Sequence, residues 1–411
     1  MIRFYCYNPY DSMPVGTVPL QRTALNMTLS ILMTTSFPIP GEYDGTAMLP
    51  IKIVRELKKN GVNVVLAHLK AKPAGGFRVE RTEFEGIPSY TLPPSRWVGG
   101  LKQIQKLHHF DLVHAQHYGG ATRCLPACLL HDWPLVYEIH SLLGDEVERD
   151  KLGRGLKFRA TRFMEQAACN HAAEVIVLGE PVGEVCRTEK SVPADRIHTI
   201  YPGIDLGEYE HEVQPFEIPG IGPNHKVVMY IGSIVHPNQG VPLLIDALPA
   251  IFAADPDARC VLVGGPAPAG IEYQTRIAPY GDRLITITGT TPDQVVALSR
   301  RADVLVHPRL ACRENYSVQS KIAVYLAAGR PIIATNFGDY KMLIGEKQSG
   351  LLVDVSPDAI ATGVIDLLQN PSKAAALAAN TRAVAEEYFA MSRNIQRYLN
   401  VYQSAIQRGN R

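Results

Sequence analysis

The chain has 411 residues, which suggests two or three domains at about 100–200 residues per domain. Its composition, 46% hydrophobic and 20% charged, is that of a globular protein and excludes fibrous, collagen-like and disordered classes. Lys and Arg number 41 against 40 Asp and Glu, a net charge of +1, so we expect no nucleic-acid partner, and any basic function must be local.

The cysteine pattern and the hydropathy pattern point to the cytoplasm. The seven cysteines include no CxxC pair, which argues against a disulfide framework or a zinc site. No apolar run reaches the ~18 residues that a bilayer span needs, and the first residues lack the basic and then apolar order of a signal peptide. We therefore expect a cytoplasmic protein that uses no metal or other cofactor.

The first half of the chain alternates between strands and helices. Residues 1–26 are either a peripheral extension or precede a biological start at Met27. Strands are predicted at 29–35, 62–66, 112–113, 134–139, 174–178 and 197–201, with a helix of clear apolar period at 46–60. Strands separated by helical stretches predict βαβ units and a parallel sheet.

A segment at 202–223, rich in Pro, Gly and acidic residues, is typical of a linker, and a second series follows it. Strands are predicted at 227–231, 260–263, 284–288, 304–306, 331–334 and 350–353, and helices at 241–253, 292–301, 317–328, 357–368, 373–389 and 392–407. The predicted fold is α/β, with two doubly wound Rossmann-like domains, 27–205 and 206–389, the first completed by a helix at 390–411. Ligands of such sheets bind beyond the carboxyl ends of the strands, so we expect the site in the cleft between the domains.

Two glycine-bearing loops are candidate phosphate contacts. The loop at 37–45 contains Gly45, where the backbone can approach a ligand and the next helix offers free amides to an anion. It is not GxGxxG, so NAD binding gets little support. The loop after 227–231 runs through Ser233 to Gln239, which are polar anchors. For both loops the alternative is a simple turn.

Three histidines, His114, His117 and His140, lie at predicted strand ends, which face the ligand edge of a doubly wound domain. The first two are predicted in a loop after the strand at 112–113, and His140 directly follows the strand at 134–139. Each is a candidate ligand contact, and the alternative is a hydrogen-bonded structural imidazole.

The start of the helix predicted at 317–328 is dense in polar groups. Asn315 and Ser317 are both good N-caps, and Lys321 follows on the same face. Arg309 and Glu314 lie in the approach loop. First-turn amides there can hold a diphosphate, and Lys321 adds a positive charge. The alternative is a plain capped helix.

A basic stretch at 149–162 carries six cations and one acidic residue. With the leucines in it and Phe163 it can form an amphipathic surface that touches anionic lipid. The alternative is a solvated helix that packs through its leucines.

Several motifs, in order over about residues 28–405, resemble glycosyltransferase family 4, which comprises retaining enzymes of the GT-B fold. They are LSILMTTSFP, PGEYDG, DLVHAQHYGG, PLVYEIHS, HTIYPGIDLGEY, YIGS followed by QGV, and SKIAVYLAAGRPIIATN. The resemblance implies a nucleotide-diphosphate-sugar donor on the second domain and an acceptor on the first. It implies that His140 lies near the transferred sugar and that Gly45 belongs to the phosphate loop.

The chain departs from the family pattern at four positions. Tyr316 and Val324 stand where the family has two glutamates eight residues apart, and Ser233 and Gln239 replace its Arg and Lys. The resulting pattern resembles an exopolysaccharide-type subgroup. Because Val324 forms no side-chain hydrogen bond, ribose recognition would come from elsewhere.

The resulting hypothesis is retaining transfer of a hexose from a UDP- or GDP-sugar to a glycan, a lipid-linked acceptor or a small molecule. His140 would contact the donor sugar, and Gly45, Ser233, Gln239, Asn315 and Lys321 would line the diphosphate. The alternatives are a GT-B sugar-nucleotide epimerase and a catalytically impaired partner that binds a nucleotide sugar.

Overall fold

The computed structural model describes residues 29–36, 45–69, 79–142 and 155–409. The predictions for the extension at 1–26, for the loop up to residue 44 and for the first part of the basic stretch at 149–162 lie outside the described residues.

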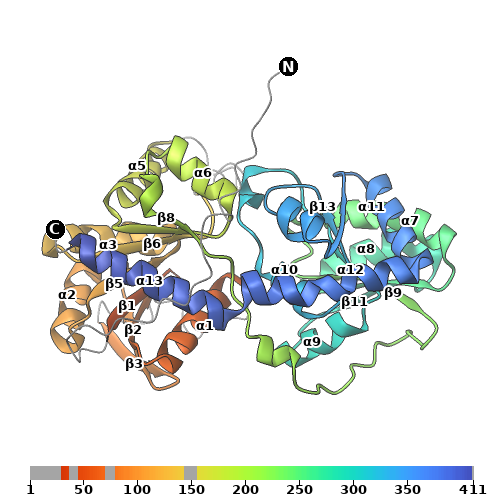
Figure 1. Ribbon diagram of the computed structural model, residues 1–411, viewed down its shortest axis with the longest axis horizontal. Helices are drawn as coiled ribbons and strands as arrows, with labels where there is room; N and C mark the ends of the chain where they lie inside the picture. The colour runs from red at the N-terminus through yellow and green to blue at the C-terminus, as the bar shows by residue number, and fades with distance from the viewer. Residues whose placement is uncertain (1–28, 37–44, 70–78, 143–154, 410–411) are drawn as a thin grey trace.

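The first domain is built on a sheet in the order β3-β4-β2-β1-β5-β6-β7-β8 (Figure 1). Its strands are β1 (Ser30–Thr35), β2 (Asn63–Leu69), β3 (Glu80–Phe84), β4 (Ile87–Leu92), β5 (Leu112–Gln116), β6 (Leu135–Ile139), β7 (Glu174–Val177) and β8 (Ile197–Thr199). Its helices are α1 (Gly45–Lys59), α2 (Trp97–His108), α3 (His117–His131), α5 (Leu156–His171) and α6 (Glu180–Thr188), with short turns η1 (Pro94–Arg96) and η2 (Ala194–Arg196).

The second domain has a parallel sheet in the order β11-β10-β9-β12-β13-β14. Its strands are β9 (Lys226–Ile231), β10 (Ala258–Val263), β11 (Leu284–Ile287), β12 (Val304–His307), β13 (Ile332–Thr335) and β14 (Gly350–Val353). Its helices are α7 (Val241–Ala254), α8 (Ala267–Ile277), α9 (Pro292–Arg301), α10 (Ser320–Ala327), α11 (Pro357–Gln369) and α12 (Pro371–Val384). Short helical turns are η3 (Leu206–Tyr209), η4 (Pro237–Gln239), η5 (Ala278–Tyr280), η6 (Arg313–Tyr316), η7 (Lys341–Glu346) and η8 (Ala385–Phe389).

The predicted α/β fold with two doubly wound, largely parallel sheets is confirmed. Both faces of the first sheet are covered: Ile31 and Met33 of β1 enter one core cluster and Leu32 enters the other, because successive strand residues point to opposite faces. The sequence reasoning misses the antiparallel pair β3–β4 at the edge of this sheet. β3 reads ERTEF and is mostly exposed, so it has no apolar run to reveal it.

The last helix, α13 (Met391–Gly409), leaves the second domain and packs on the first (Figure 1). Its buried residues Ile395, Tyr398 and Tyr402 join the core cluster that contains Ile31. The crossing backbone pairs with the linker, because Ile204 N–H donates to Phe389 O at 2.7 Å and Met391 N–H donates to Ile204 O at 2.9 Å. The two chain crossings between the domains therefore lie side by side.

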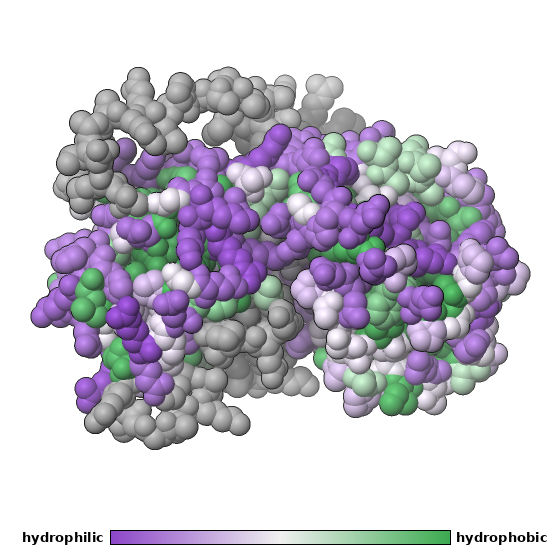
Figure 2. Space-filling model, turned by 90° about the horizontal axis from the view of Figure 1, so that it is seen from below, coloured by the Kyte–Doolittle hydropathy of each residue, from purple (hydrophilic) through white to green (hydrophobic). Residues whose placement is uncertain are grey.

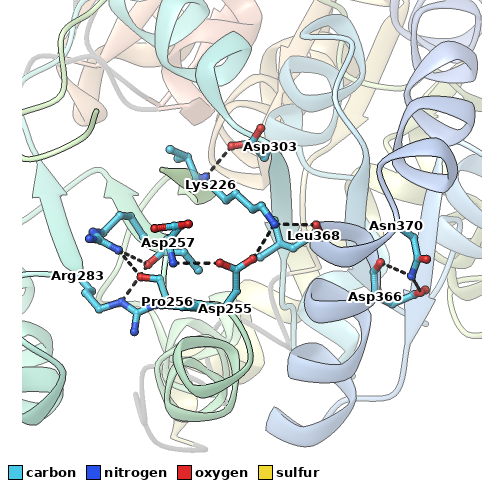
Figure 3. Close-up of polar contacts among 12 residues, drawn as sticks. Lys226, Asp255, Pro256, Asp257, Arg283, Asp303, Asp366, Leu368 and Asn370 are labelled. Atoms are coloured by element: carbon cyan, nitrogen blue, oxygen red, sulfur yellow. Dashed lines mark hydrogen bonds and ion pairs between the residues drawn. The ribbon is translucent and has the colours of Figure 1, made fainter. Parts of the chain in front are cut away.

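At the amino-terminal edge of the second sheet, charged side chains form hydrogen bonds with other groups of the same domain (Figure 3). Lys226 Nζ donates to Asp255 Oδ2 at 2.8 Å and to Leu368 O at 3.1 Å. Arg283 donates to the carbonyls of Phe252 and Ala258 at 3.0 Å each. This cluster ties β9, α7 and α11 together and lies at the edge opposite the one where ligands of such sheets bind.

In the part of the chain that the structure describes, no helix is both long and apolar enough to cross a bilayer. On the face shown in Figure 2, hydrophobic residues form small separate patches among hydrophilic ones. In α5, Arg159 and Arg162 are exposed and Phe163 is 70% exposed. Membrane contact through this stretch stays a prediction.

Candidate active site

The candidate site begins where the strand order of the second sheet reverses. β9 pairs with β10 on one side and with β12 on the other, so the loops after β9 and β12 diverge at this point. Such switch points form the ligand crevice of doubly wound sheets. The loop after β9 carries Ser233 and Gln239, and the loop after β12 carries Arg309 and Asn315.

Lys321 of α10 reaches into the loop after β9. Its Nζ lies 2.8 Å from Tyr230 Oη and 2.5 Å from Gln239 Oε1, and it sits 4.5 Å from the centre of the Tyr230 ring. Tyr230 Oη donates to the carbonyl of Ser233 at 2.7 Å. The structure therefore brings together the predicted residues Ser233, Gln239 and Lys321.

The surroundings of Lys321 disfavour the positive charge of its ammonium group. Burial lowers the pKa of Lys321 well below its ordinary value, and the nearby Arg309 guanidinium lowers it further. The hydrogen-bond partners recorded for Nζ, Tyr230 and Gln239, are both uncharged. An anion bound here would supply the missing negative charge and favour the protonated lysine.

Arg309 and Asn315 knit the two loops together. Arg309 is buried and donates to Asn315 Oδ1, while Asn315 Nδ2 donates to the carbonyls of Asn238 and Leu310. Thr335 Oγ1 donates to Arg309 O at 2.7 Å. Arg309 and Asn315, both predicted as site residues, are buried and hold the two loops together.

The predicted start of α10 is wrong. The helix begins at Ser320, Asn315 lies in the short turn η6, and neither Asn315 nor Ser317 caps α10. Ser317 is extended, with φ −77° and ψ 135°, because the next residue is engaged elsewhere. Val318 N–H donates to Leu178 O of the first domain at 2.8 Å.

The segment after η6 therefore forms a junction between the domains. Tyr316 packs against the core of the first domain, and a Cβ placed on Gly179 would lie 2.3 Å from Tyr316 O. Asp339, after β13, accepts from Glu180 N–H at 2.9 Å and from Tyr201 Oη at 3.1 Å. The segments at the ligand edge of the second sheet thus lie next to the carboxyl end of β7.

His140 lies beside this junction. Ile139 of β6 pairs with Val177 of β7, so His140 stands level with Leu178, one strand spacing of about 4.8 Å away. Its Nε2 lies 2.7 Å from Gln116 Oε1 and 3.3 Å from Glu138 Oε1. The predicted position of His140 beyond a strand end is correct.

The other two histidines differ from the prediction, which placed both in a loop. His114 lies inside β5 and is fully buried, with Nδ1 2.9 Å from Tyr402 Oη, and its contact with a ligand stays a prediction. The strand β5 continues past Val113 through His114, and the short apolar run at 112–113 did not reveal this. His117 opens α3, and its Nε2 lies 3.2 Å from Ser141 Oγ.

The remaining predicted residues are placed as follows. Gly45 is the first residue of α1, as expected for a glycine before a helix, and Glu314 lies in η6. Val324 packs against the core of the second domain, while Tyr316 stacks on Phe337 at 5.7 Å between ring centres. The substrate contacts of all these residues stay predictions.

The sequence reasoning misses Tyr230, Gln116, Glu138 and Asp339. The first three are polar residues within buried strands, close to the carboxyl ends of these strands. That position is a usable signal, since a buried polar group needs a partner. Among the described residues, no three His, Cys, Asp or Glu side chains are grouped so that they could hold a metal ion.

Comparison with known protein families decides the class. The family described as Glycosyltransferase Family 4 matches residues 43–208, and the one described as Glycosyl transferases group 1 matches residues 225–370. The chain belongs to glycosyltransferase family 4. It is a glycosyltransferase of the GT-B type, and the two matches divide it between the two sheets.

The chain is similar in sequence to named glycosyltransferases, and it shares its fold with solved structures. The chain is 27% identical to the D-inositol 3-phosphate glycosyltransferase of Corynebacterium diphtheriae over 80% of this chain and 83% of that protein. Sucrose-phosphate synthase of Thermosynechococcus elongatus superposes with a TM-score of 0.73 at 17% identity, covering 91% of this chain and 98% of that one. HepE of Anabaena, solved with UDP and glucose, gives 0.69 at 19% identity, covering 92% and 100%.

Proposed function

We propose that this glycosyltransferase moves a hexose, with retention of anomeric configuration, from a UDP- or GDP-sugar to a glycan, a lipid-linked acceptor or a small molecule. The nucleotide diphosphate would bind at the switch point of the second sheet, and the acceptor would bind on the first domain. HepE of Anabaena, a structural neighbour, is described in complex with UDP-glucose, which supports a donor of this class.

The main support for this proposal is the environment of Lys321. Its Nζ is held by Tyr230 Oη and Gln239 Oε1, both uncharged, and burial lowers its pKa. Departure of the sugar leaves a diphosphate anion, which a fixed cation in a water-poor crevice stabilises strongly. Lys321 supplies that cation without a metal ion.

His140 supplies the contact from the first domain. It stands level with Leu178, whose carbonyl bonds to Val318 of the second domain, so the donor sugar would lie between His140 and the diphosphate. Closure of the domains over the donor would exclude water and suppress donor hydrolysis.

The proposal is tested by ligand binding and by turnover. UDP or GDP should raise the melting temperature, and the Lys321→Met variant should bind the preferred nucleotide about 10–100-fold more weakly, because a charged hydrogen bond is lost. Lys341→Met, which removes an exposed lysine of the same domain, should leave binding unchanged. Equal binding by wild type and Lys321→Met contradicts the assignment of the diphosphate site.

Turnover separates the alternatives. A panel of sugar nucleotides is incubated with and without acceptors, and His140→Ala should lower transfer while leaving nucleotide binding nearly unchanged. Conversion of the donor to an epimer without acceptor favours the epimerase. Nucleotide binding without any turnover favours the catalytically impaired partner.

A further inference from the structure

A fully buried carboxylate lies directly beneath His140. Glu138, on the same strand, has 0% exposure, and its Oε1 lies 3.3 Å from His140 Nε2. Its Oε2 accepts from Gln116 Nε2 at 3.0 Å and lies 3.1 Å from His114 Nε2. A buried charge of this kind is costly unless it is well paired, so its partners should be strictly oriented.

The charge of Glu138 fixes the direction of the hydrogen bonds around it. Burial raises the pKa of Glu138, but the neighbouring His114 and His140 outweigh burial and lower the pKa below its ordinary value. The ionised carboxylate can only accept, so the amide nitrogen of Gln116 must face it. The amide oxygen of Gln116 then faces His140 Nε2 at 2.7 Å.

His140 Nε2 is therefore surrounded by acceptors. Gln116 Oε1 and Glu138 Oε1 are both within 3.3 Å of it, and neither can donate in this arrangement. The proton of a neutral ring must then sit on Nε2, which leaves the lone pair on Nδ1. The hydrogen bond at one ring nitrogen of a histidine thus decides which of the two nitrogens carries the proton.

The sheet and α13 hold this network rigidly. Gln116 and Glu138 are direct partners in the β5–β6 register, and His114 lies two residues before Gln116. His114 Nδ1 lies 2.9 Å from Tyr402 Oη of α13, so the network is also anchored from the opposite side. The side chains beneath His140 have little room to rearrange.

We infer that Glu138 is a positioning residue that, through Gln116, holds His140 as the Nε2–H tautomer, so that Nδ1 accepts a hydrogen bond from a hydroxyl group of the donor sugar. The part that concerns the sugar rests on the proposed function. The part that concerns the tautomer does not, and it is measurable without substrate.

The first measurement is the nitrogen NMR spectrum of the full-length protein with isotope-labelled histidine side chains. It is recorded at a pH where the His140 ring is neutral, and the His140→Ala variant identifies the His140 signals. Wild type should show His140 protonated on Nε2. In Glu138→Gln, the new amide can donate to Gln116, which frees Gln116 to turn its own NH₂ toward His140. The proton should then move to Nδ1.

Glu174→Gln is the matched control. Glu174 is also fully buried, on the adjacent strand β7, and it also pairs with a histidine and with α13, through His198 at 2.7 Å and Arg408 at 2.7 Å. Its loss should leave the His140 tautomer unchanged. A merely structural role for Glu138 predicts the same result for both variants.

Kinetics and a rescue complete the test. Glu138→Gln should lower kcat by about 10–100-fold, a size seen when outer-shell partners are removed, with a smaller change in donor KM. The double variant Gln116→Glu with Glu138→Gln exchanges the two groups. It again presents an acceptor to Nε2, and should restore the Nε2–H tautomer and much of the rate.

The outcomes are separable. An Nδ1–H tautomer in wild type, or an unchanged tautomer and kcat in Glu138→Gln, overturns the inference. If Glu138→Gln fails to fold, the wild-type spectrum and the exchanged double variant still decide. If no donor gives turnover, the proposed function fails, while the NMR measurement still tests the tautomer.

Discussion

At the scale of single residues, the junction between the domains contains a carboxylate in an unfavourable setting. One oxygen of Asp339 accepts from both Glu180 N–H and Tyr201 Oη. Burial raises the pKa of Asp339 to about 6, and the hydrogen bonds from these two groups only partly offset burial. The ionised form is therefore less stable in the folded protein than in the unfolded chain.

We predict that Asp339→Asn stabilises the protein above pH 6. The folded-state pKa, about 6, exceeds the ordinary value of 3.8, so the unfolded chain releases this proton first as pH rises. The contribution of Asp339 to stability thus falls between these values and stays low above them. Asparagine keeps an accepting oxygen without the charge. The gain should reach up to about 3 kcal/mol at pH 7 and vanish near pH 4.

Urea denaturation of both proteins from pH 4 to pH 8 measures this gain. The control is Asp366→Asn, which removes an exposed carboxylate paired with Lys373 and should change stability by less than about 0.5 kcal/mol. A variant that is less stable than wild type at pH 7 would show that the Asp339 charge is needed at the junction.

At the scale of elements, the sequence predicts well what depends on local pattern. The strands at 227–231 and 260–263 are continuous apolar runs, and buried parallel strands require such runs. The start of α10 depends instead on a distant partner. Asn315 and Ser317 have the chemistry of helix caps, but the carbonyl of Leu178 claims Val318 N–H, and no local pattern encodes that contact.

The same distinction explains the candidate site. Lys321 and Gln239 are predicted because they lie in loops and first turns at strand ends, where ligand edges form. Glu138 is missed because its role depends on Gln116 and His114 of another strand. Tyr402, more than 250 residues away along the chain, completes that network, and only the packing of α13 brings it there.

The docking of α13 gives a prediction at this scale. Asn394 is fully buried and donates to the carbonyls of Tyr201 at 2.9 Å and Tyr388 at 3.2 Å. Asn394→Ala leaves both carbonyls buried without this donor, and should cost about 2–3 kcal/mol in the free energy of unfolding. Asn380→Ala, which removes an exposed bond to Gln348 O, should cost less than about 0.5 kcal/mol. Equal denaturation midpoints for the two variants would contradict this role of Asn394.

At the scale of the whole molecule, the domains meet through contacts of two kinds. The two chain segments that connect the domains are hydrogen-bonded to each other at Ile204 and Met391, close to α13. Non-covalent contacts form at the ligand edge, where Val318 bonds to Leu178 and Arg313 pairs with Glu189 at 2.7 Å. The crossings can act as a hinge, and the contacts at the ligand edge set how far the crevice closes.

Gly179 is the point where a small change should open the molecule. A Cβ at Gly179 would lie 2.3 Å from the carbonyl oxygen of Tyr316, a clash between the backbones of the two domains. Gly179→Ala should therefore separate the ligand edges, increase the radius of gyration in X-ray scattering and speed hydrogen exchange at the Val318 amide. Gly222→Ala, in the linker, where a Cβ meets nothing within 4 Å, should change neither quantity. If Gly179→Ala keeps the wild-type radius and Val318 protection, the contact does not limit closure.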